Sequence, residues 1–401
     1  MSKIKIKWDN HIKKYQEALE ELNLDFCILT RVKSITYLTG CFVPWKSYIF
    51  LPKEGFGEPE LFTVLLDVER VKDEAQSSIK VSGWGPMKGF YWEKKVQNAA
   101  KKAGVYKPKL KAPRIGVETG IDICMTGQML SYTEAHYLNK VFPGCELVDF
   151  NEKTEQIQLI KEPEEIEMLR KASEITDIGQ AAVKKTLEER APGKTFTENE
   201  IAGIGTLAMR RAGSNYEWTF TGSQEIGSGY RASYTFNGCT PATNKIVKEG
   251  ESLLVDLHSE YGCYLGDLSH NYVLGKCPPE LKKFNDVYEQ LCYALIDNMQ
   301  VGNTFDECYQ AVRKVAEKEG FENDLFFGIG HGIGCIGNES YPVVLPGKDW
   351  GHMAFEENMV EIAAIVFNRP GLGGLRLESP TLITKKGAEV LPKTRFEVDY
   401  V

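Results

Sequence analysis

Two aspartates and one histidine are the residues of this chain whose types and spacing best suit catalysis. Asp256 and Asp267 lie eleven positions apart in the segment LLVDLHSEYGCYLGDLSH, and His331 follows in the glycine-rich segment GIGHGIG. Two carboxylates and an imidazole are the groups that a divalent metal needs in order to hold and activate a water molecule. This constellation predicts a hydrolase.

Strand-like apolar runs surround both aspartates. We expect Asp256 at the end of one strand and Asp267 at the start of the next, with the turn EYGCY between them. Paired antiparallel strands would place both carboxylates on one face, whereas the alternative is a hairpin with two solvated aspartates. The glycines around His331 allow the backbone to approach a ligand closely. Glu378, in GGLRLESP, is the last acid of interest.

The C-terminal half shows helices followed by hairpin-like strands. Pro163 suits the first turn of a long helix, and further helices are expected over about 198–211, 279–300 and 304–319. The strand-like runs are LLVDL, NYVLG, VEIAAIVF and LRLESPTLIT. This order predicts an α+β fold with an antiparallel sheet.

The N-terminal half alternates short apolar runs with helical segments. Helical spacing extends over residues 8–22, near 95–103 and over 125–139, and the apolar runs occupy 26–30, 48–52, 60–66 and 114–119. This alternation predicts an α/β layer, with a sheet flanked by helices. We therefore expect two domains, residues 1–155 and 156–401.

Length and composition are typical of a soluble, cytoplasmic protein of two domains. The 401 residues exceed one ordinary domain, and 42% hydrophobic and 26% charged residues are globular values. A net charge of -8 argues against nucleic acid as a partner. No apolar run approaches the roughly 20 residues that span a bilayer, and no secretory signal is visible. Ten cysteines without regular spacing suggest reduced thiols.

Taken in order, these segments resemble the pita-bread family of Xaa-Pro peptidases, methionine aminopeptidases and creatinase, peptidase family M24. The resemblance covers nearly the whole chain and is carried by IKEPEEIEMLRKA, TPATNKIVKEGE, VDLHSEYGCYLGDLS, GIGHGIG and GGLRLESPTLITKKGAEVL. It implies an N-terminal creatinase-like α/β domain and a C-terminal pita-bread catalytic domain with a curved antiparallel sheet. It also implies a homodimer.

The resemblance assigns a metal site that lacks one ligand. Four of the five family ligand positions are matched, by Asp256, Asp267, His331 and Glu378, and the last three of these are the expected catalytic residues. The fifth position, a glutamate in the family, is Ala364, which has no atom able to bind a metal. Glu361 lies three residues earlier and would face the opposite side of a strand. The resemblance therefore implies one divalent metal ion (Mn, Fe, Co or Zn) or none.

Two substrate-binding histidines of the family are also replaced. Cys239 stands at the first position and Asn338 at the second, although the adjacent Glu339 is retained. In the peptidases these histidines hydrogen-bond the substrate and the tetrahedral intermediate. One such donor is worth roughly 10²–10³ in rate, so their joint loss argues against an ordinary prolidase.

Three further residues are expected to contact the substrate. Arg376 resembles the active-site arginine of the family. Trp45 and Lys46 lie where the N-terminal domain of the family reaches the partner's pocket, and there they would cover the substrate and pair with its carboxylate. The alternative is a surface Trp-Lys pair. His270 suits either a replacement base or a structural histidine.

These departures favour the branch of the family that acts on small molecules. We expect a hydrolase that cleaves a C–N bond in a small amino-acid-like or zwitterionic substrate, as creatinase and ectoine hydrolase do. The alternatives are a metal-dependent Xaa-Pro dipeptidase or aminopeptidase, a lyase acting on a sulfonium zwitterion, and a catalytically inactive binding protein of the same fold. The last is disfavoured because the four retained charged residues would bear a desolvation cost without a role.

Overall fold

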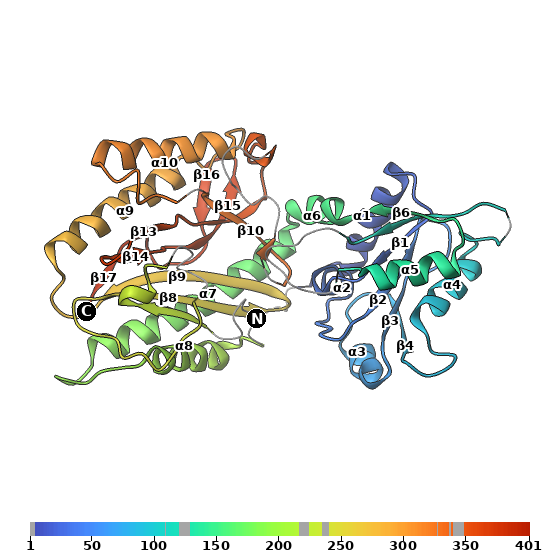
Figure 1. Ribbon diagram of the computed structural model, residues 1–401, viewed down its shortest axis with the longest axis horizontal. Helices are drawn as coiled ribbons and strands as arrows, with labels where there is room; N and C mark the ends of the chain where they lie inside the picture. The colour runs from blue at the N-terminus through green and yellow to red at the C-terminus, as the bar shows by residue number, and fades with distance from the viewer. Residues whose placement is uncertain are drawn as a thin grey trace. The chain divides into compact units, whose positions relative to one another are not determined.

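The computed structural model describes residues 5–108, 110–119, 129–215, 224–234, 240–326, 328–336, 338–339 and 349–401 (Figure 1). At residues 338, 339, 349 and 350 it describes the backbone alone. The chain divides into two compact units, Met1–Gln158 and Leu159–Val401. Each unit has its own hydrophobic core.

The N-terminal unit is built on a six-stranded mixed sheet. Across the sheet, its strands are β4 (Lys80–Trp84), β3 (Glu60–Val64), β2 (Tyr48–Pro52), β1 (Phe26–Leu29), β5 (Arg114–Val117) and β6 (Glu146–Asp149). Its helices are α1 (Trp8–Glu21), α2 (Val32–Thr39), α3 (Val68–Glu74), α4 (Trp92–Ala103), α5 (Tyr132–Val141) and α6 (Asn151–Leu159). The expected sheet flanked by helices is confirmed, and strand β4 adds an edge that the apolar runs did not predict.

Helix α2 begins beside a group of buried charges. The carboxylate of Glu118 accepts hydrogen bonds from the backbone N–H groups of Thr30 (2.6 Å) and Arg31 (2.8 Å), which precede the helix. Glu155 of α6 pairs with the side chains of Arg31 (2.6 Å) and Lys33 (2.7 Å). All four charged side chains are almost fully buried, so these ion pairs are part of the interior of the unit.

The C-terminal unit contains two sheets and a short hairpin. The four-stranded sheet has the order β17 (Asp399–Tyr400), β9 (Tyr264–Val273), β8 (Ser252–Tyr261), β7 (Glu225–Ser228). The five-stranded sheet has the order β11 (Asn338–Glu339), β10 (Gly330–Ile333), β12 (Val360–Ala363), β15 (Ser379–Thr384), β16 (Gly387–Val390), and β13 (Phe367–Arg369) pairs with β14 (Gly373–Leu375). Every pair is antiparallel except β17–β9, which confirms the expected antiparallel pairing.

Strands β8 and β9 form a long hairpin that carries both aspartates. The strands are longer than expected, so Asp256 lies in the middle of β8 rather than at its end. The register places Asp256 opposite Ser269 and His258 opposite Asp267. Directly opposed residues of an antiparallel pair project to the same face. These four side chains therefore form one polar face of the hairpin.

Helices α7 (Pro163–Glu188) and α8 (Glu198–Ala212) pack against the other face of the hairpin (Figure 1, green). Pro163 occupies the first turn of α7, as expected. A side chain at Gly266 of β9 would come within 2.5 Å of the carbonyl oxygen of Ala172, so only glycine lets α7 lie directly on the strand. This close packing leaves the polar face free to form a site.

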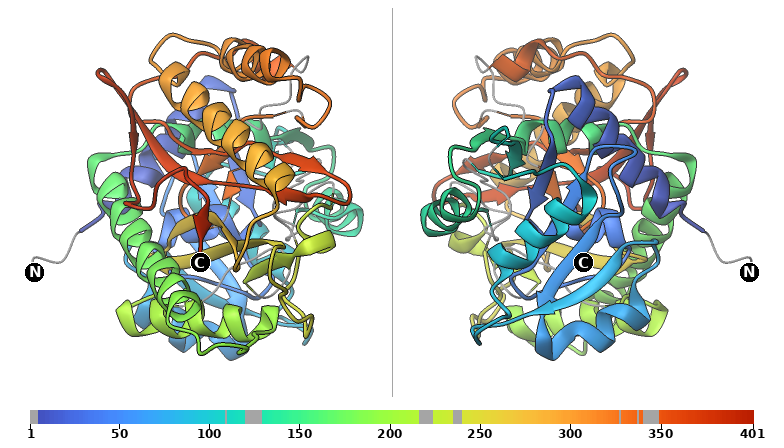
Figure 2. Two further views of the ribbon diagram at one scale, coloured as in Figure 1. Left: turned by 90° about the vertical axis from the view of Figure 1, so that its left-hand side faces the viewer. Right: turned by 90° about the vertical axis from the view of Figure 1, so that its right-hand side faces the viewer.

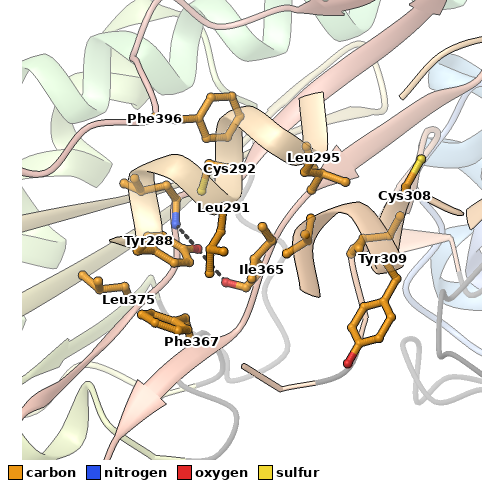
Figure 3. Close-up of a cluster of buried hydrophobic side chains, with 14 of the residues drawn as sticks. Tyr288, Leu291, Cys292, Leu295, Cys308, Tyr309, Ile365, Phe367, Leu375 and Phe396 are labelled. Carbon is orange, nitrogen blue, oxygen red and sulfur yellow. Dashed lines mark hydrogen bonds between the residues drawn. The ribbon is translucent and has the colours of Figure 1, made fainter. Parts of the chain in front are cut away.

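Helices α9 (Pro279–Asn298) and α10 (Phe305–Glu319) supply the largest apolar core of the unit. Both helices, drawn in orange, cover the red strands of the C-terminal segment (Figure 2). Figure 3 shows part of this core, with Tyr288 and Leu291 of α9 packed near Phe367 and Leu375. No helix within the described ranges is both long and apolar enough to cross a membrane.

Candidate metal centre

The polar face of the β8–β9 hairpin brings three potential metal ligands together. The Nε2 atom of His258 lies 3.2 Å from Oδ1 of Asp267 and 3.9 Å from Oδ1 of Asp256. The three side chains are at most 2% exposed. The expected placement of both aspartates on one face is thus what the strand register produces, with a histidine between them.

Glu378 is attached to the same face through Ser269. The two residues form an antiparallel bridge, in which each backbone N–H donates to the other's carbonyl group (3.1 and 3.2 Å). The Ser269 hydroxyl also donates to Oε2 of Glu378 (2.8 Å). These three bonds fix the carboxylate beside the hairpin.

His331 of β10 faces both Glu378 and Asp267. Its Nε2 atom lies 3.3 Å from Oε1 of Glu378 and 3.9 Å from Oδ2 of Asp267. Its Nδ1–H group donates to the carbonyl oxygen of Gly332 (2.9 Å). Metal-binding histidines commonly donate their second ring N–H to such an acceptor, which orients the ring. Gly330 has a φ of +129°, and a side chain there would collide with the carbonyl oxygen of Ile362 (1.6 Å), so glycine is required where β10 meets β12.

The register of β10 and β12 explains why Ala364 matters. His331 lies opposite Ile362, so the alternation of the strand places residue 364 on the same side as His331. Ala364 is buried there, and its side chain has no atom able to bind a metal. Glu361 lies opposite Gly332 and projects to the other side, which confirms that it is no substitute.

Arg376 partly neutralises the carboxylates. Its guanidinium group contacts Oδ2 of Asp256 (3.2 Å) and both oxygens of Glu378 (2.6 Å each). The bidentate contact fits the planar geometry of arginine and carboxylate. Arg376 therefore restrains two of the acids and leaves Oδ1 of Asp256 directed toward His258.

The clustered charges shift the ionisation of their members in opposite directions. Burial opposes charge on His258, but Asp267 and Asp256 outweigh it and raise its pKa to about 10. Burial raises the pKa of Asp256 well above its ordinary value. For Asp267 burial acts in the same direction, yet the neighbouring His258 lowers its pKa to about 2. Burial also raises the pKa of Glu225, on the adjacent strand β7.

The donor atoms fit a divalent metal ion. Asp256, His258 and Asp267 offer ligand atoms that all lie within 4.8 Å of one another, and so do Asp267, His331 and Glu378. Oδ1 of Asp256 and both carboxylate oxygens of Asp267 are buried without a hydrogen-bond partner. Buried carboxylate oxygens are costly unless a partner satisfies them, and a cation bound between the clusters would do so.

Several predicted substrate-binding residues belong to the N-terminal unit or lie outside the described residues. Cys239 is not among the described residues, and only the backbone of Asn338 and Glu339, in strand β11, is described. Trp45 is 50% exposed in the N-terminal unit. Lys46 pairs with Glu134 (3.3 Å) and donates to the carbonyl oxygen of Met129 (3.1 Å).

His258 and Glu225 are site residues that the sequence analysis missed. His258 follows Asp256 by two positions, which is the spacing of side chains on one face of a strand, so this signal was present. Glu225 was not recognisable, because only the pairing of β7 with β8 brings it opposite Asp256. His270 projects from the hairpin toward Asp399 (2.9 Å) and belongs to neither ligand cluster.

Tyr288 connects the apolar core to the site (Figure 3). Its hydroxyl donates to the carbonyl oxygen of Ile365 (2.5 Å), beside Ala364, and accepts from the N–H of Leu377 (2.8 Å), beside Glu378. We expect Tyr288→Phe to lower the free energy of unfolding by about 1–3 kcal/mol, because the Leu377 N–H loses its partner. Metal affinity should fall as well. Denaturant unfolding and metal titration measure the two effects, and unchanged values for both would contradict this connection.

The N-terminal unit is a sheet flanked by helices, and the C-terminal unit carries a carboxylate–histidine cluster on an antiparallel hairpin. Together they define the class of two-domain proteins with a metallohydrolase-type site. The chain belongs to metallopeptidase family M24, the pita-bread family, which residues 167–385 match. Residues 11–160 match the creatinase/prolidase N-terminal domain. The fold class expected from the sequence is confirmed.

Similar proteins cover almost the full chain. An Xaa-Pro dipeptidase of Pyrococcus horikoshii is 23% identical over 96% of this chain and 98% of its own length. The X-Pro aminopeptidase structure from Thermotoga maritima has a TM-score of 0.80 at 18% identity, over 97% of this chain and 99% of the other. The N-terminal domain of FACT complex subunit SPT16 from chickpea has a TM-score of 0.72 at 12% identity, over 96% and 97%. The fold thus occurs both in peptidases and in a subunit of a complex.

Proposed function

We propose that this protein is a metal-dependent hydrolase that cleaves the amide C–N bond of dipeptides of the Xaa-Pro type. The observation that carries the proposal is the sharing of Asp267 between two carboxylate–histidine clusters, in a chain that aligns end to end with Xaa-Pro dipeptidases. This was the alternative in the sequence analysis, where the substitutions at Ala364, Cys239 and Asn338 favoured a small-molecule hydrolase. The relatives favour the peptidase.

Five charged residues of the centre have a role in this reaction. Asp256, Asp267, His331 and Glu378 would hold the metal, which when bound lowers the pKa of water and polarises a substrate carbonyl group. Arg376 keeps two of the carboxylates oriented and limits their mutual repulsion. Burial raises the pKa of Asp256 well above its ordinary value, so metal binding would displace a proton from this carboxyl group.

The second candidate is hydrolysis of a C–N bond in a small zwitterion of the creatine or ectoine type. It is favoured by Ala364, because the family has a glutamate at this position and the site therefore lacks one carboxylate on the side of His331. A site with fewer acids would hold its metal less tightly and leave more room beside His331. Action of the protein as a homodimer, with Trp45 and Lys46 at the partner's pocket, is also a proposal; the exposure of Trp45 supports it.

A substrate screen of the metal-depleted protein separates the candidates. The apo-protein is supplied with Mn²⁺, Co²⁺ or Zn²⁺ and tested on Ala-Pro and Gly-Pro, with Ala-Ala as the matched dipeptide lacking proline. We expect release of proline that depends on added metal and little cleavage of Ala-Ala. Turnover of ectoine or creatine without release of proline would replace the first proposal by the second. Release of a volatile sulfide from a sulfonium zwitterion would indicate a lyase, and inactivity on every compound would favour a binding protein.

A further inference from the structure

His258 and His331 face different oxygens of the same carboxylate. Nε2 of His258 lies 3.2 Å from Oδ1 of Asp267, and Nε2 of His331 lies 3.9 Å from Oδ2. Each histidine also has a second carboxylate nearby, Asp256 at 3.9 Å and Glu378 at 3.3 Å respectively. The two ligand clusters therefore have similar composition and dimensions, and Asp267 bridges them.

We propose that His258 is a metal ligand, and that Asp256, His258 and Asp267 form a second metal position next to that of Asp267, His331 and Glu378. Metal bonds of about 2.1 Å in a tetrahedral arrangement place neighbouring ligand atoms about 3.4 Å apart. The separations of His258 from the two aspartates, 3.2 and 3.9 Å, lie on either side of that value. All three ligand atoms lie within 4.8 Å of one another, so the side chains must move closer together to bind an ion.

The buried carboxylate oxygens of this position face the two histidines at ion-pair distances. Oδ1 of Asp256 and both oxygens of Asp267 make no well-formed hydrogen bond, and all three side chains of the position are at most 2% exposed. Arg376 donates to the other oxygen of Asp256, Oδ2 (3.2 Å), whereas Oδ1 faces His258 (3.9 Å). One cation between His258 and the aspartates and a second cation beside His331 would together satisfy these three buried carboxylate oxygens.

His258 brings the number of protein ligands back to five, although it serves the other metal position from the one beside which Ala364 lies. His258 is the fifth protein ligand, and it comes from β8 rather than from β12. The other four are Asp256, Asp267, His331 and Glu378. The replacement exchanges a carboxylate oxygen for an imidazole nitrogen. Imidazole suits zinc and iron, whereas oxygen ligands suit manganese. We therefore expect Zn²⁺ to bind more tightly than Mn²⁺.

Gln224, which directly precedes β7, holds the backbone of His258 in place. The side chain of Gln224 donates to the carbonyl oxygen of His258 (3.1 Å) and accepts from its N–H (2.7 Å). Together with the pairing to β9, these bonds fix the position of the residue on the hairpin. Such support is what a ligand needs in order to keep its geometry.

Metal stoichiometry tests the proposal without any substrate. The apo-protein is dialysed to equilibrium against Zn²⁺ and the bound metal is measured by mass spectrometry. We expect two ions per wild-type chain, and one tightly bound ion in His258→Ala and His258→Asn. Because loss of a group that only orients a ligand costs 10–100-fold in affinity, loss of the ligand itself should weaken the second ion by at least about 100-fold. His270→Asn, which changes another buried histidine of the same hairpin, should keep two ions.

His258→Asn retains a polar side chain of moderate size, so loss of the second ion in this variant can be assigned to loss of the imidazole. Circular dichroism establishes that each variant is folded before metal is added. Absorption spectra during Co²⁺ titration report the ligands of each ion, and the second equivalent should lose its bands in His258→Asn but not in His270→Asn. A single ion in the wild type, or two equally tight ions in His258→Asn, would overturn the proposal. Neither result depends on whether Xaa-Pro dipeptides are the substrates.

Discussion

Replacing His331 with alanine is expected to reduce kcat/KM by more than about 100-fold, because loss of a group that merely orients a metal ligand already costs up to that factor. His331 is the only nitrogen donor in the cluster with Asp267 and Glu378. Its ring contributes little to the apolar core, so the variant should fold. Steady-state kinetics on the substrate found in the screen measures the loss, and metal titration should show weaker binding.

His352→Ala is the matched control for this experiment. The side chain of His352 is 85% exposed and pairs with Asp306, outside both ligand clusters. Its removal should leave kcat/KM unchanged. If His331→Ala retained activity within about two-fold of the wild type, the interaction with the transition state would be negligible and the proposed centre would be wrong.

Replacing Glu155 with glutamine is expected to lower the free energy of unfolding of the N-terminal unit by about 3–5 kcal/mol. The substitution keeps the size of the side chain but removes the negative charge that pairs with the buried Arg31 and Lys33. Glu21→Gln removes one partner of an exposed pair with Lys153 in the same unit and should cost less than about 1 kcal/mol. An equal effect of the two substitutions would contradict a special role for the buried pairs.

The pH dependence of the Glu155 effect has a definite sign. Burial alone would raise the pKa of Glu155, but Lys33 and Arg31 lower it from 4.5 to about 2. The folded state therefore binds fewer protons than the unfolded state between these values. The stabilisation is complete above about pH 4.5 and is lost as the pH falls toward 2. Urea unfolding followed by tryptophan fluorescence suits the measurement, because four of the six tryptophans lie in this unit, Trp8, Trp45, Trp84 and Trp92.

Local patterns in the sequence predicted most of the elements of this fold. The helices that begin near Trp8, Pro163, Pro279 and Phe305 follow from apolar spacing and from capping or proline signals, which act within a few residues. The extent of β8 and β9 was underestimated because polar residues such as Asp256 interrupt the apolar runs. A buried polar face has no apolar alternation, so tertiary pairing alone defines these strands.

The candidate site was only partly predictable for a related reason. The family resemblance drew attention to Asp256, Asp267 and His331, and to the absence of a donor at Ala364. It did not draw attention to His258, because residue 258 is not one of the five ligand positions of the family. The consequence of an imidazole there appears only when the register places it opposite Asp267. The roles assigned to all of these residues remain predictions.

The hairpin register has a consequence for comparing relatives. In any chain with the same eleven-residue step between its two aspartates and the same tight turn, the residue two positions after the first aspartate must face the second one. That single position can be identified without a structure. Chains of the family can therefore be sorted by whether it holds a small residue, which leaves the space open, or a histidine, which fills it as His258 does. Such a sorting would identify proteins that share this variant centre before any of them is purified.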